Sequence, residues 1–346
     1  MNTFGHILRL TTAGESHGPA MTAILDGFPA GIAIDRDMLN EYMKQRRPGG
    51  GNPGTSARRE ADRVEILSGV FEGISTGTPI TLMIRNEDAR SADYDALRDV
   101  YRPSHADYTY EAKYGIRDHR GGGRSSARET ALRVAAGALA DMALRPLGIT
   151  VDARIDSIGG LKAASSECSE NSEYSEAIEQ LLERCLREGD TVGGVVRCVI
   201  RGVPAGLGEP VYGKLQAQLA AAMMSINAAH GFEYGMGFAG ADRLGSEMLD
   251  TFIPDAQSRI TTATNHSGGI QGGISNGRDI TFRVAFKPIA TMMRPMQTVD
   301  RSGRSVTIEP HGRHDVCAVP RAVPVVAAMA RLVILDAILH NRTARL

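Results

Sequence analysis

Two kinds of hydrophobic pattern alternate along this chain. Short β-branched runs bounded by turn-forming residues predict strands at 7–12, 21–25, 80–84, 195–200 and 280–286. Apolar side chains recur at three- and four-residue spacing elsewhere, which predicts helices at 35–46, 126–144, 176–187, 214–229 and 323–340. This mixture of strands and helices predicts a layered α/β (α+β) fold.

Length and composition indicate one folded unit. The 346 residues are 42% hydrophobic, which is enough to build a substantial core. No internal repeat is visible, and the polar stretch 165–175 is interpreted as a surface loop. We therefore expect a single domain over residues 1–346.

The charge balance limits the partners that the chain can have. The 39 Lys and Arg residues and 40 Asp and Glu residues leave a net charge of -1, which argues against coating of nucleic acid or of an anionic membrane. No signal pattern is seen, and no run approaches the roughly 18 to 20 apolar residues of a membrane span. The four cysteines form no C-x-x-C pair, as expected for reduced thiols. We expect a cytoplasmic protein without nucleic-acid or membrane partners.

Arginine and glycine are unusually frequent. Of the 39 basic residues, five are lysine and 34 are arginine, whose planar fork matches phosphate and carboxylate groups. Glycine-rich loops occur at 48–54, 121–123, 235–240 and 268–277. Since glycine lets the backbone approach a ligand closely, these loops are where we expect a site.

The strongest local signal is the segment 120–129, which reads R-G-G-G-R-S-S-A-R-E. Ser126 and Glu129 have the spacing of a capping box at the start of an alanine-rich helix. Free amides at a helix N-terminus, with arginines beside them, favour an anion such as phosphate. The common nucleotide loops G-x-x-x-x-G-K-[ST] and G-x-G-x-x-G are absent here, which argues against ATP-dependent chemistry.

Three further clusters carry histidine. His17 lies between glycines in G-E-S-H-G (14–18), and His105 follows Arg102 in R-P-S-H-A-D (102–107). An exposed histidine can donate or accept a proton near neutral pH. The third cluster, H-G-R-H-D (311–315), matches no familiar zinc spacing, so we expect no metal and favour an acid–base role for Asp315.

Together with S-I-N-A (225–228), N-H-S-G-G-I-Q-G-G-I-S-N-G (265–277) and K-P-I-A-T (287–291), the motifs at 14–20, 102–107, 120–130 and 312–317 resemble those of the chorismate synthase family. The resemblance runs in order from residue 1 to about 335. It implies a single-domain β-α sandwich of antiparallel sheets with helices, assembled as a homotetramer. Two stretches, 48–54 and 236–262, depart from the usual family pattern.

The resemblance also implies a reaction. Members are carbon–oxygen lyases of the shikimate pathway, the route to the aromatic amino acids, and convert 5-enolpyruvylshikimate 3-phosphate to chorismate by 1,4-anti elimination of phosphate. They require reduced FMN without net redox change, and NADP is associated with the family. The chain has no spare length for a reductase domain, so a separate flavin reductase would supply reduced FMN.

Residue roles follow from the same motifs. The resemblance implies that His17 protonates the departing phosphate, that His105 protonates the flavin, and that Asp315 assists deprotonation. Substrate contacts would come from Ser16, Arg46, Arg47, Arg58, Arg102 and Arg120. Flavin contacts would come from Arg124, Ser125, Ser126, Asn227, Ala228, Gly272, Lys287, Pro288, Ile289, Ala290, Thr291 and Arg313.

Two other functions remain open on the sequence. A flavin-dependent oxidoreductase could use the same groups for hydride transfer from a nicotinamide. A non-catalytic anion-binding or assembly protein would also be rich in arginine and glycine, but it would not need the histidines.

Overall fold

The computed structural model describes residues 1–47, 61–87, 94, 97–163, 175–309 and 315–345. Their helices are α1 (Arg36–Arg46), α2 (Asp107–Tyr114), α3 (Thr130–Leu144), α4 (Glu176–Glu188), α5 (Leu215–Met224) and α6 (Val319–Asn341). Short 3₁₀ turns cover Gly123–Ser125 and Ala127–Glu129, immediately before α3.

Two antiparallel sheets form the outer layers, each of five strands in the described part of the chain. The first has the order β1-β2-β3-β7-β4, and the second has the order β11-β16-β10-β8-β9. The strands of the first are β1 (Thr3–Phe4), β2 (Arg9–Ala13), β3 (Ala20–Asp26), β7 (Ile80–Arg85) and β4 (Val64–Ile66). Those of the second are β11 (Ala229–Tyr234), β16 (Ile280–Phe286), β10 (Gly194–Arg201), β8 (Thr150–Ile158) and β9 (Leu161–Lys162).

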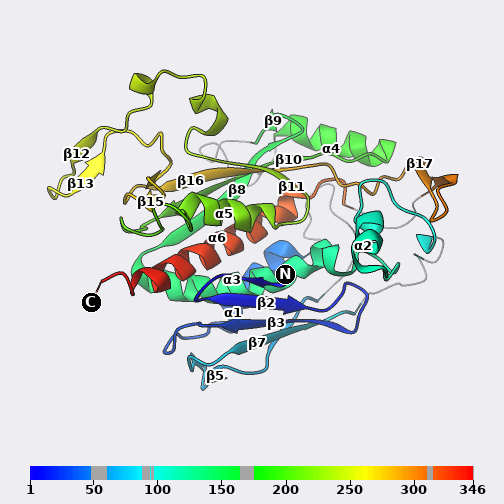
Figure 1. Cartoon of the computed structure of the whole chain (residues 1–346), viewed down its shortest axis with the longest axis horizontal. Helices are drawn as coiled ribbons and strands as arrows, with labels where there is room; N and C mark the ends of the chain where they lie inside the picture. The colour runs from blue at the N-terminus through cyan, green and yellow to red at the C-terminus, as the bar shows by residue number, and fades with distance from the viewer. Residues whose placement is uncertain (48–60, 88–93, 95–96, 164–174, 310–314, 346) are drawn as a thin grey trace.

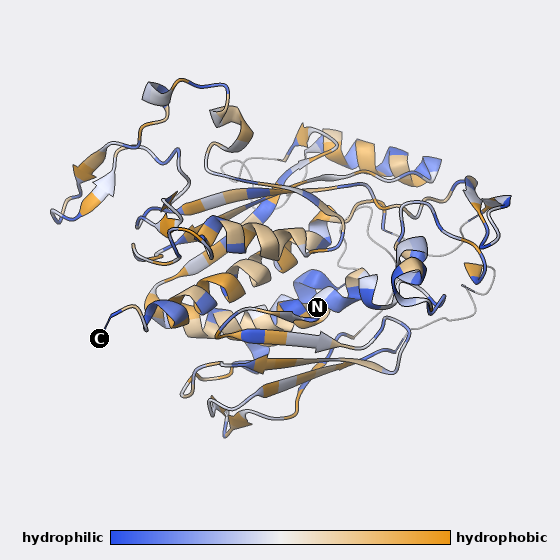
Figure 2. Ribbon diagram, viewed as in Figure 1, coloured by the Kyte–Doolittle hydropathy of each residue, from blue (hydrophilic) through white to orange (hydrophobic). Residues whose placement is uncertain are grey.

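Helices fill the space between the sheets. Helix α3 lies next to the first sheet and α5 and α6 lie next to the second, while α1 packs against α3 and α6 (Figure 1). Burial alternates along β2 and β16, because one face of each strand packs on the helices. Apolar residues are concentrated on these inner helices (Figure 2). The fold is therefore a sandwich of antiparallel sheets around helices, as predicted.

The contact between α3 and α6 depends on a glycine. A Cβ added at Gly137 would lie 2.4 Å from Cβ of Ala328 and 2.5 Å from its Cα. Real Cβ atoms do not approach other carbons so closely, so any side chain at 137 would push the two helices apart. This close approach fixes the distance between the two halves of the core.

Small hairpins extend from the sheets. They are β5 (Val70–Phe71) with β6 (Ile74–Ser75), β12 (Phe252–Pro254) with β13 (Ile260–Thr262), β14 (Ile270–Gln271) with β15 (Ile274–Ser275), and β17 (Met296–Val299) with β18 (Ser305–Ile308). The segment that carries β12 and β13 projects from the body at the upper left of Figure 1.

All ten predicted elements exist, but some boundaries differ. The helix predicted at 214–229 ends at Met224, because Ala228 has a positive φ of 65° and Ala229 begins β11. The helix predicted at 323–340 begins at Val319, with Pro320 in its first turn, where proline is tolerated. The helix predicted at 126–144 begins as 3₁₀ turns and becomes α-helical only at Thr130.

The sequence predicted no apolar run of the length of a membrane span, and helix α6 corrects that prediction. Helix α6 is long and apolar enough to cross a membrane, with a mean hydropathy of 2.1 over its most apolar stretch. However, 89% of that stretch is buried inside the protein. The helix is therefore apolar because it packs between the sheets, where every face of it meets other side chains.

Candidate functional site

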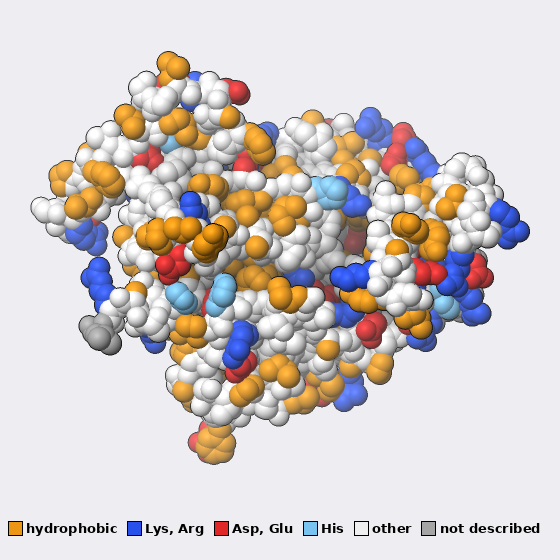
Figure 3. All heavy atoms as spheres, in the orientation of Figure 1, with side chains coloured by type: hydrophobic (Ala, Val, Ile, Leu, Met, Phe, Trp, Pro, Cys, Tyr) orange, Lys and Arg blue, Asp and Glu red, His pale blue; other side chains and the backbone are white. Residues whose placement is uncertain are grey.

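A cavity of about 390 Å³ lies at one end of the helices, where loops from distant parts of the chain meet. Figure 3 shows a hollow on this face, beside α2, with Lys and Arg side chains around it. The walls come from the loop before α2, the 3₁₀ turns before α3, the segment after α5, the loop after β16 and the first turn of α6. Five of the seven motifs chosen from the sequence contribute residues to these walls.

His17 lies behind the glycine loop. Its Nδ1 is 3.0 Å from Oγ of Ser16, and its ring packs edge-on against Tyr94 with centroids 5.0 Å apart. A Cβ at Gly121, whose φ is +81°, would lie 2.4 Å from both Cε1 and Nδ1 of the His17 ring. Tyr94 lines the cavity, so His17 lies behind this wall residue and is not itself a lining residue. The His17 ring leaves no room for a side chain at 121, which explains the glycine there.

His105 lines the cavity and is held at both ring nitrogens. Nδ1 lies 3.0 Å from the carbonyl oxygen of Pro103, and Nε2 lies 2.9 Å from Oγ1 of Thr291. A carbonyl only accepts, so Nδ1 carries the proton and Nε2 of the neutral ring accepts from the hydroxyl. Burial and the Arg102 guanidinium lower the pKa of His105 below its ordinary value. The unliganded ring is therefore neutral at neutral pH.

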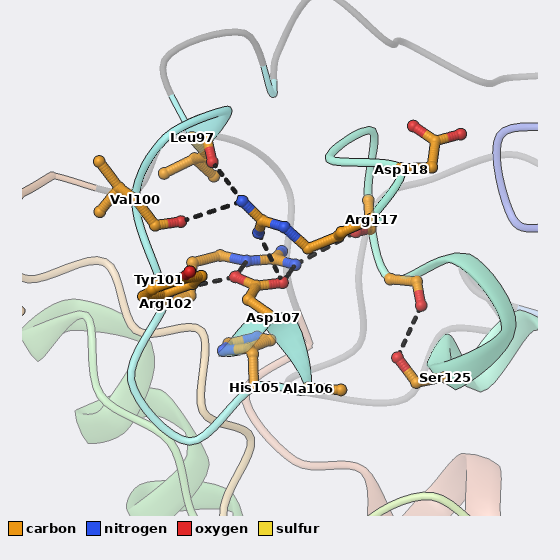
Figure 4. Close-up of polar contacts among 12 residues, drawn as sticks. Leu97, Val100, Tyr101, Arg102, His105, Ala106, Asp107, Arg117, Asp118 and Ser125 are labelled. Atoms are coloured by element: carbon orange, nitrogen blue, oxygen red, sulfur yellow. Dashed lines mark hydrogen bonds and ion pairs between the residues drawn. The ribbon is translucent and has the colours of Figure 1, made fainter. Parts of the chain in front are cut away.

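Arg102 is fixed by Asp107, as Figure 4 shows. Nε and Nη2 of Arg102 donate to the two carboxylate oxygens of Asp107 at 2.8 and 2.7 Å. Nη1 of Arg117 is 3.1 Å from the same carboxylate, and its Nη2 donates to the carbonyl of Arg98. Burial disfavours the charge on Asp107, but the hydrogen bonds from Arg102 prevail and hold its pKa below the usual range.

A second cluster of the same kind lies beneath the cavity. Nη1 of Arg46 and Nη1 of Arg128 each donate to one oxygen of Asp62 at 2.7 Å. The Asp62 side chain is fully buried and Arg46 is only 1% exposed. Burial and the neighbouring Arg321 lower the pKa of Arg46 to about 10. Arg46 therefore contributes positive charge to the wall, and it is anchored inside the protein.

The segment after α5 carries an unpaired polar atom. Nδ2 of Asn227 donates to the carbonyl of Ser125 at 2.7 Å, but its buried Oδ1 has no hydrogen-bond partner among the described residues. The next residue, Ala228, accepts from the backbone N–H of Lys287 at 2.9 Å and joins the wall to the loop after β16. An acceptor without a partner in a cavity suits a ligand with an N–H or O–H group, as a flavin has.

Asp315 is paired with a cation at the start of α6. Its Oδ2 accepts from Nη1 of Arg321 at 2.7 Å, and Nε of Arg321 donates to the carbonyl of Arg46. Both Asp315 and Arg321 line the cavity. The pair places a carboxylate in the wall of the cavity that His105 also lines.

The other predicted site residues are placed as follows. Ser125, Ser126, Lys287, Ile289, Ala290 and Thr291 line the cavity. Arg124 lines a neighbouring cavity of about 380 Å³ and donates to Thr12 and to the carbonyl of Gly14. Arg120 lies at the surface, where it pairs with Asp118. Gly272 lies in the turn between β14 and β15, outside the walls of either cavity. Arg58 and Arg313 lie outside the described residues.

The capping-box prediction is wrong in its second half. Oγ of Ser126 does accept from the backbone N–H of Arg128, at 3.3 Å. Glu129 does not reach back to Ser126; its carboxylate instead accepts from Thr12 and from Nε of Arg133 at 2.8 Å. Glu129 therefore ties the 3₁₀ turn to β2 rather than closing the cap.

Sequence reasoning missed several residues that shape the site. Asp107 belongs to the motif at 102–107, but its ion pairs with Arg102 and Arg117 were not predicted. Tyr94, Asp62 and Arg321 carried no signal, because each reaches the site only through tertiary contacts. Arg128 belongs to the motif at 120–129, but its buried ion pair with Asp62 was not predicted.

The fold and the cavity define a class of protein: an enzyme that binds an anionic small molecule among arginines and holds histidines at the site. Comparison with known proteins agrees. A family model described as chorismate synthase matches residues 8–339. The chain is 52% identical to the chorismate synthase of Bacteroides thetaiotaomicron and 53% identical to that of Bacteroides fragilis, in both cases across 100% of this chain and 99% of the relative.

A solved crystal structure of a chorismate synthase superposes with a TM-score of 0.75 at 32% identity, covering 97% of this chain and 92% of the other. The chain belongs to the chorismate synthase family. Membership makes it an enzyme of the shikimate pathway and of aromatic amino-acid biosynthesis, with a small-molecule substrate and a flavin cofactor.

Proposed function

We propose that this enzyme eliminates phosphate from 5-enolpyruvylshikimate 3-phosphate in a 1,4-anti sense and releases chorismate, as a carbon–oxygen lyase. The observation that supports it most is the convergence of His105, a carboxylate and anchored arginines on one cavity, with His17 packed against the Tyr94 ring that lines it. The substrate carries a phosphate and two carboxylates, so a cationic wall is chemically required.

The wall offers donors to these anions. Nη1 of Arg102 makes no hydrogen bond to any described residue, while Nε and Nη2 are held by Asp107. Lys287 reaches the loop of His105, where Nζ donates to the carbonyl of Ser104 at 3.3 Å. We propose Ser16, Arg46, Arg47, Arg58, Arg102 and Arg120 as the substrate-binding set, with Arg46 acting through its buried charge.

The cavity suits FMN on the evidence of the orphaned Oδ1 of Asn227, which can accept from a ring N–H. Ser125, Ser126, Asn227, Ala228 and the segment 287–291 would hold it, and Arg124, Gly272 and Arg313 complete the proposed set. When bound, reduced FMN would supply electron density to the substrate without net redox change. A separate flavin reductase would supply it in reduced form.

Proton transfers fall to the protein's own groups. His17, whose Nδ1 is tied to Ser16, would donate a proton to the departing phosphate. His105 would hold a proton at Nε2, the nitrogen that faces Thr291. The pKa of His105 is lowered in the unliganded protein, so the ring must gain its proton when the anionic ligands bind. Nearby negative charge raises the pKa of a histidine because it favours imidazolium. Asp315, oriented by Arg321, would assist deprotonation of the substrate through the flavin.

The test is an anaerobic turnover assay with reduced FMN in catalytic amount. Chorismate and phosphate should accumulate in equal amounts over many turnovers per flavin. Oxidation of one reduced flavin for each product formed would instead indicate the oxidoreductase alternative and overturn the proposal.

Substitution of the histidines separates an enzyme from an anion-binding protein. His17→Ala and His105→Ala should each lower turnover by on the order of 100-fold, the usual contribution of a general acid. Flavin titration should show that both variants still bind FMN. Unchanged turnover in both variants would refute the acid assignments.

We further propose a homotetramer of single-domain subunits, located in the cytoplasm. The segment 236–264 projects from the body (Figure 1) and exposes large apolar side chains, among them Phe238 and Ile260, each 80% exposed. Such surfaces are typical of contacts between subunits. Light scattering should show a tetramer for the wild type and smaller species for the Phe238→Ser, Ile260→Ser double variant. A tetramer that persists in this variant would place the contacts elsewhere.

A further inference from the structure

Asp107 contributes no atom to the walls of the main cavity, yet it touches residues that the reaction needs. Its side chain is 5% exposed and lies at the first residue of α2, two positions after His105. It accepts three hydrogen bonds from Arg102, from the backbone N–H, Nε and Nη2. The carboxylate therefore fixes both the backbone and the side chain of the residue that begins the His105 loop.

The same carboxylate is anchored from its other side. Arg117, whose side chain is 6% exposed, contacts Oδ1 of Asp107 at 3.1 Å and donates through Nη2 to the carbonyls of Leu97 and Arg98. Figure 4 shows the two guanidinium groups facing one carboxylate. Asp107 is thus held in place by a cation that does not belong to the cavity.

This arrangement decides which edge of Arg102 meets a ligand. Asp107 occupies the edge formed by Nε and Nη2, and Nη2 also donates to the carbonyl of Gly121 at 3.1 Å. Among the contacts of the described residues, Nη1 is the one guanidinium nitrogen left for an anion in the cavity. A guanidinium held in this way loses little freedom when an anion binds, which strengthens binding.

We propose that Asp107 is a positioning residue, which presents Nη1 of Arg102 to the bound substrate and holds the loop of His105 in register. The inference rests on the proposed function. It predicts that Asp107 acts on substrate binding through Arg102 and on the proton affinity of His105 through its own charge.

The charged groups near His105 allow the second effect to be measured. Arg102 and Asp107 face the ring from its own loop and α2, and Lys287 faces it from the segment after β16. The two cations lower the pKa of His105 and the Asp107 carboxylate raises it, so loss of that charge must lower the pKa further.

The experiment compares Asp107→Asn, Asp107→Glu and Arg102→Ala with a matched control, Asp152→Asn. Asp152 lies on β8, is half exposed and pairs with Arg154, outside the cavity walls. Histidine NMR titration of the unliganded protein gives the pKa of His105, and steady-state kinetics give KM and kcat.

Asp107→Asn should lower the pKa of His105 and raise KM about tenfold, the value of one charge-assisted hydrogen bond. Asp107→Glu keeps the charge but moves it, so it should raise KM and leave the pKa of His105 nearer the wild-type value. Asp107→Asn added to Arg102→Ala should raise KM no further, because both changes remove the same interaction. The control should match the wild type in both measurements.

Additive effects on KM, or an unchanged His105 pKa in Asp107→Asn, would overturn the proposal. If Asp107→Asn does not fold, the cycle is run with Asp107→Glu and Arg102→Ala, and additive effects of these two changes on KM would likewise overturn the proposal. The NMR titration needs no turnover, so failure of the proposed reaction in the wild type would be seen separately.

Discussion

Gly121→Ala is the sharpest test of the position of His17. Gly121 has φ +81°, and a Cβ there would lie 2.4 Å from Cε1 and Nδ1 of the ring and 3.2 Å from Oγ of Ser16. Ordinary contact between such atoms begins at about 3.5 Å, so the ring must retreat by about 1 Å. Misplacement of a catalytic group by that distance costs about 100-fold in rate.

The backbone contributes a separate cost, which a control can remove. Alanine in the left-handed region costs about 1–2 kcal/mol whatever surrounds it. Gly115, at the end of α2, has φ 72° and nothing within 4 Å of an added Cβ. Gly115→Ala therefore has the backbone cost alone, without contact with a histidine, and Gly121→Ala should lose at least as much stability in urea unfolding.

The decisive difference between the two variants should be in the reaction. We expect kcat of Gly121→Ala to fall about 100-fold while its affinity for FMN, measured by titration, stays within a few-fold of the wild type. Gly115→Ala should keep wild-type kcat. Equal kcat values in the two variants would show that the His17 ring does not need its present position.

Three further predictions concern the frame of the site. Burial opposes the charge of Asp62, but Arg46 and Arg128 outweigh burial and lower the pKa of this carboxyl. The contribution of Asp62 to stability is therefore present above the unfolded pKa of about 3.9 and is lost as pH falls through the folded pKa. Asp62→Asn should thus lower the free energy of unfolding by about 3–5 kcal/mol at pH 7, and the deficit should shrink below about pH 4 in urea titrations; a deficit independent of pH would contradict this. Gly137→Ala should destabilise the protein by about 1–3 kcal/mol in urea unfolding, because its Cβ would meet Ala328, and wild-type stability would mean that α3 and α6 can separate freely. Ser126→Ala should weaken FMN binding and cost at most about 1 kcal/mol of stability, and an unaltered flavin titration would place the anion elsewhere.

Hydrophobic periodicity was a sound guide to the elements of the core. Residues 280–286 alternate in the sequence and alternate in burial in β16, and 176–187 show the single apolar face that α4 buries through Ile178, Leu182 and Cys185. It was less useful for elements shaped by their surroundings. Helix α2, strand β8 and strand β11 were not predicted, and the start of α3 depends on Glu129 bonding to Thr12 on a distant strand.

By itself, the sequence determined the layered α/β class, the glycine loops and the histidine motifs, because period and turn chemistry are local properties. Tertiary structure decided which charges meet. Arg102 and His105 are three residues apart in the chain, but Thr291, 186 positions away from His105, binds its ring. Asp62 holds Arg128 across 66 residues, and Gly121 makes room for His17. Such pairings depend on the packing of the whole core, because a buried charge is stable only where folding brings its partner.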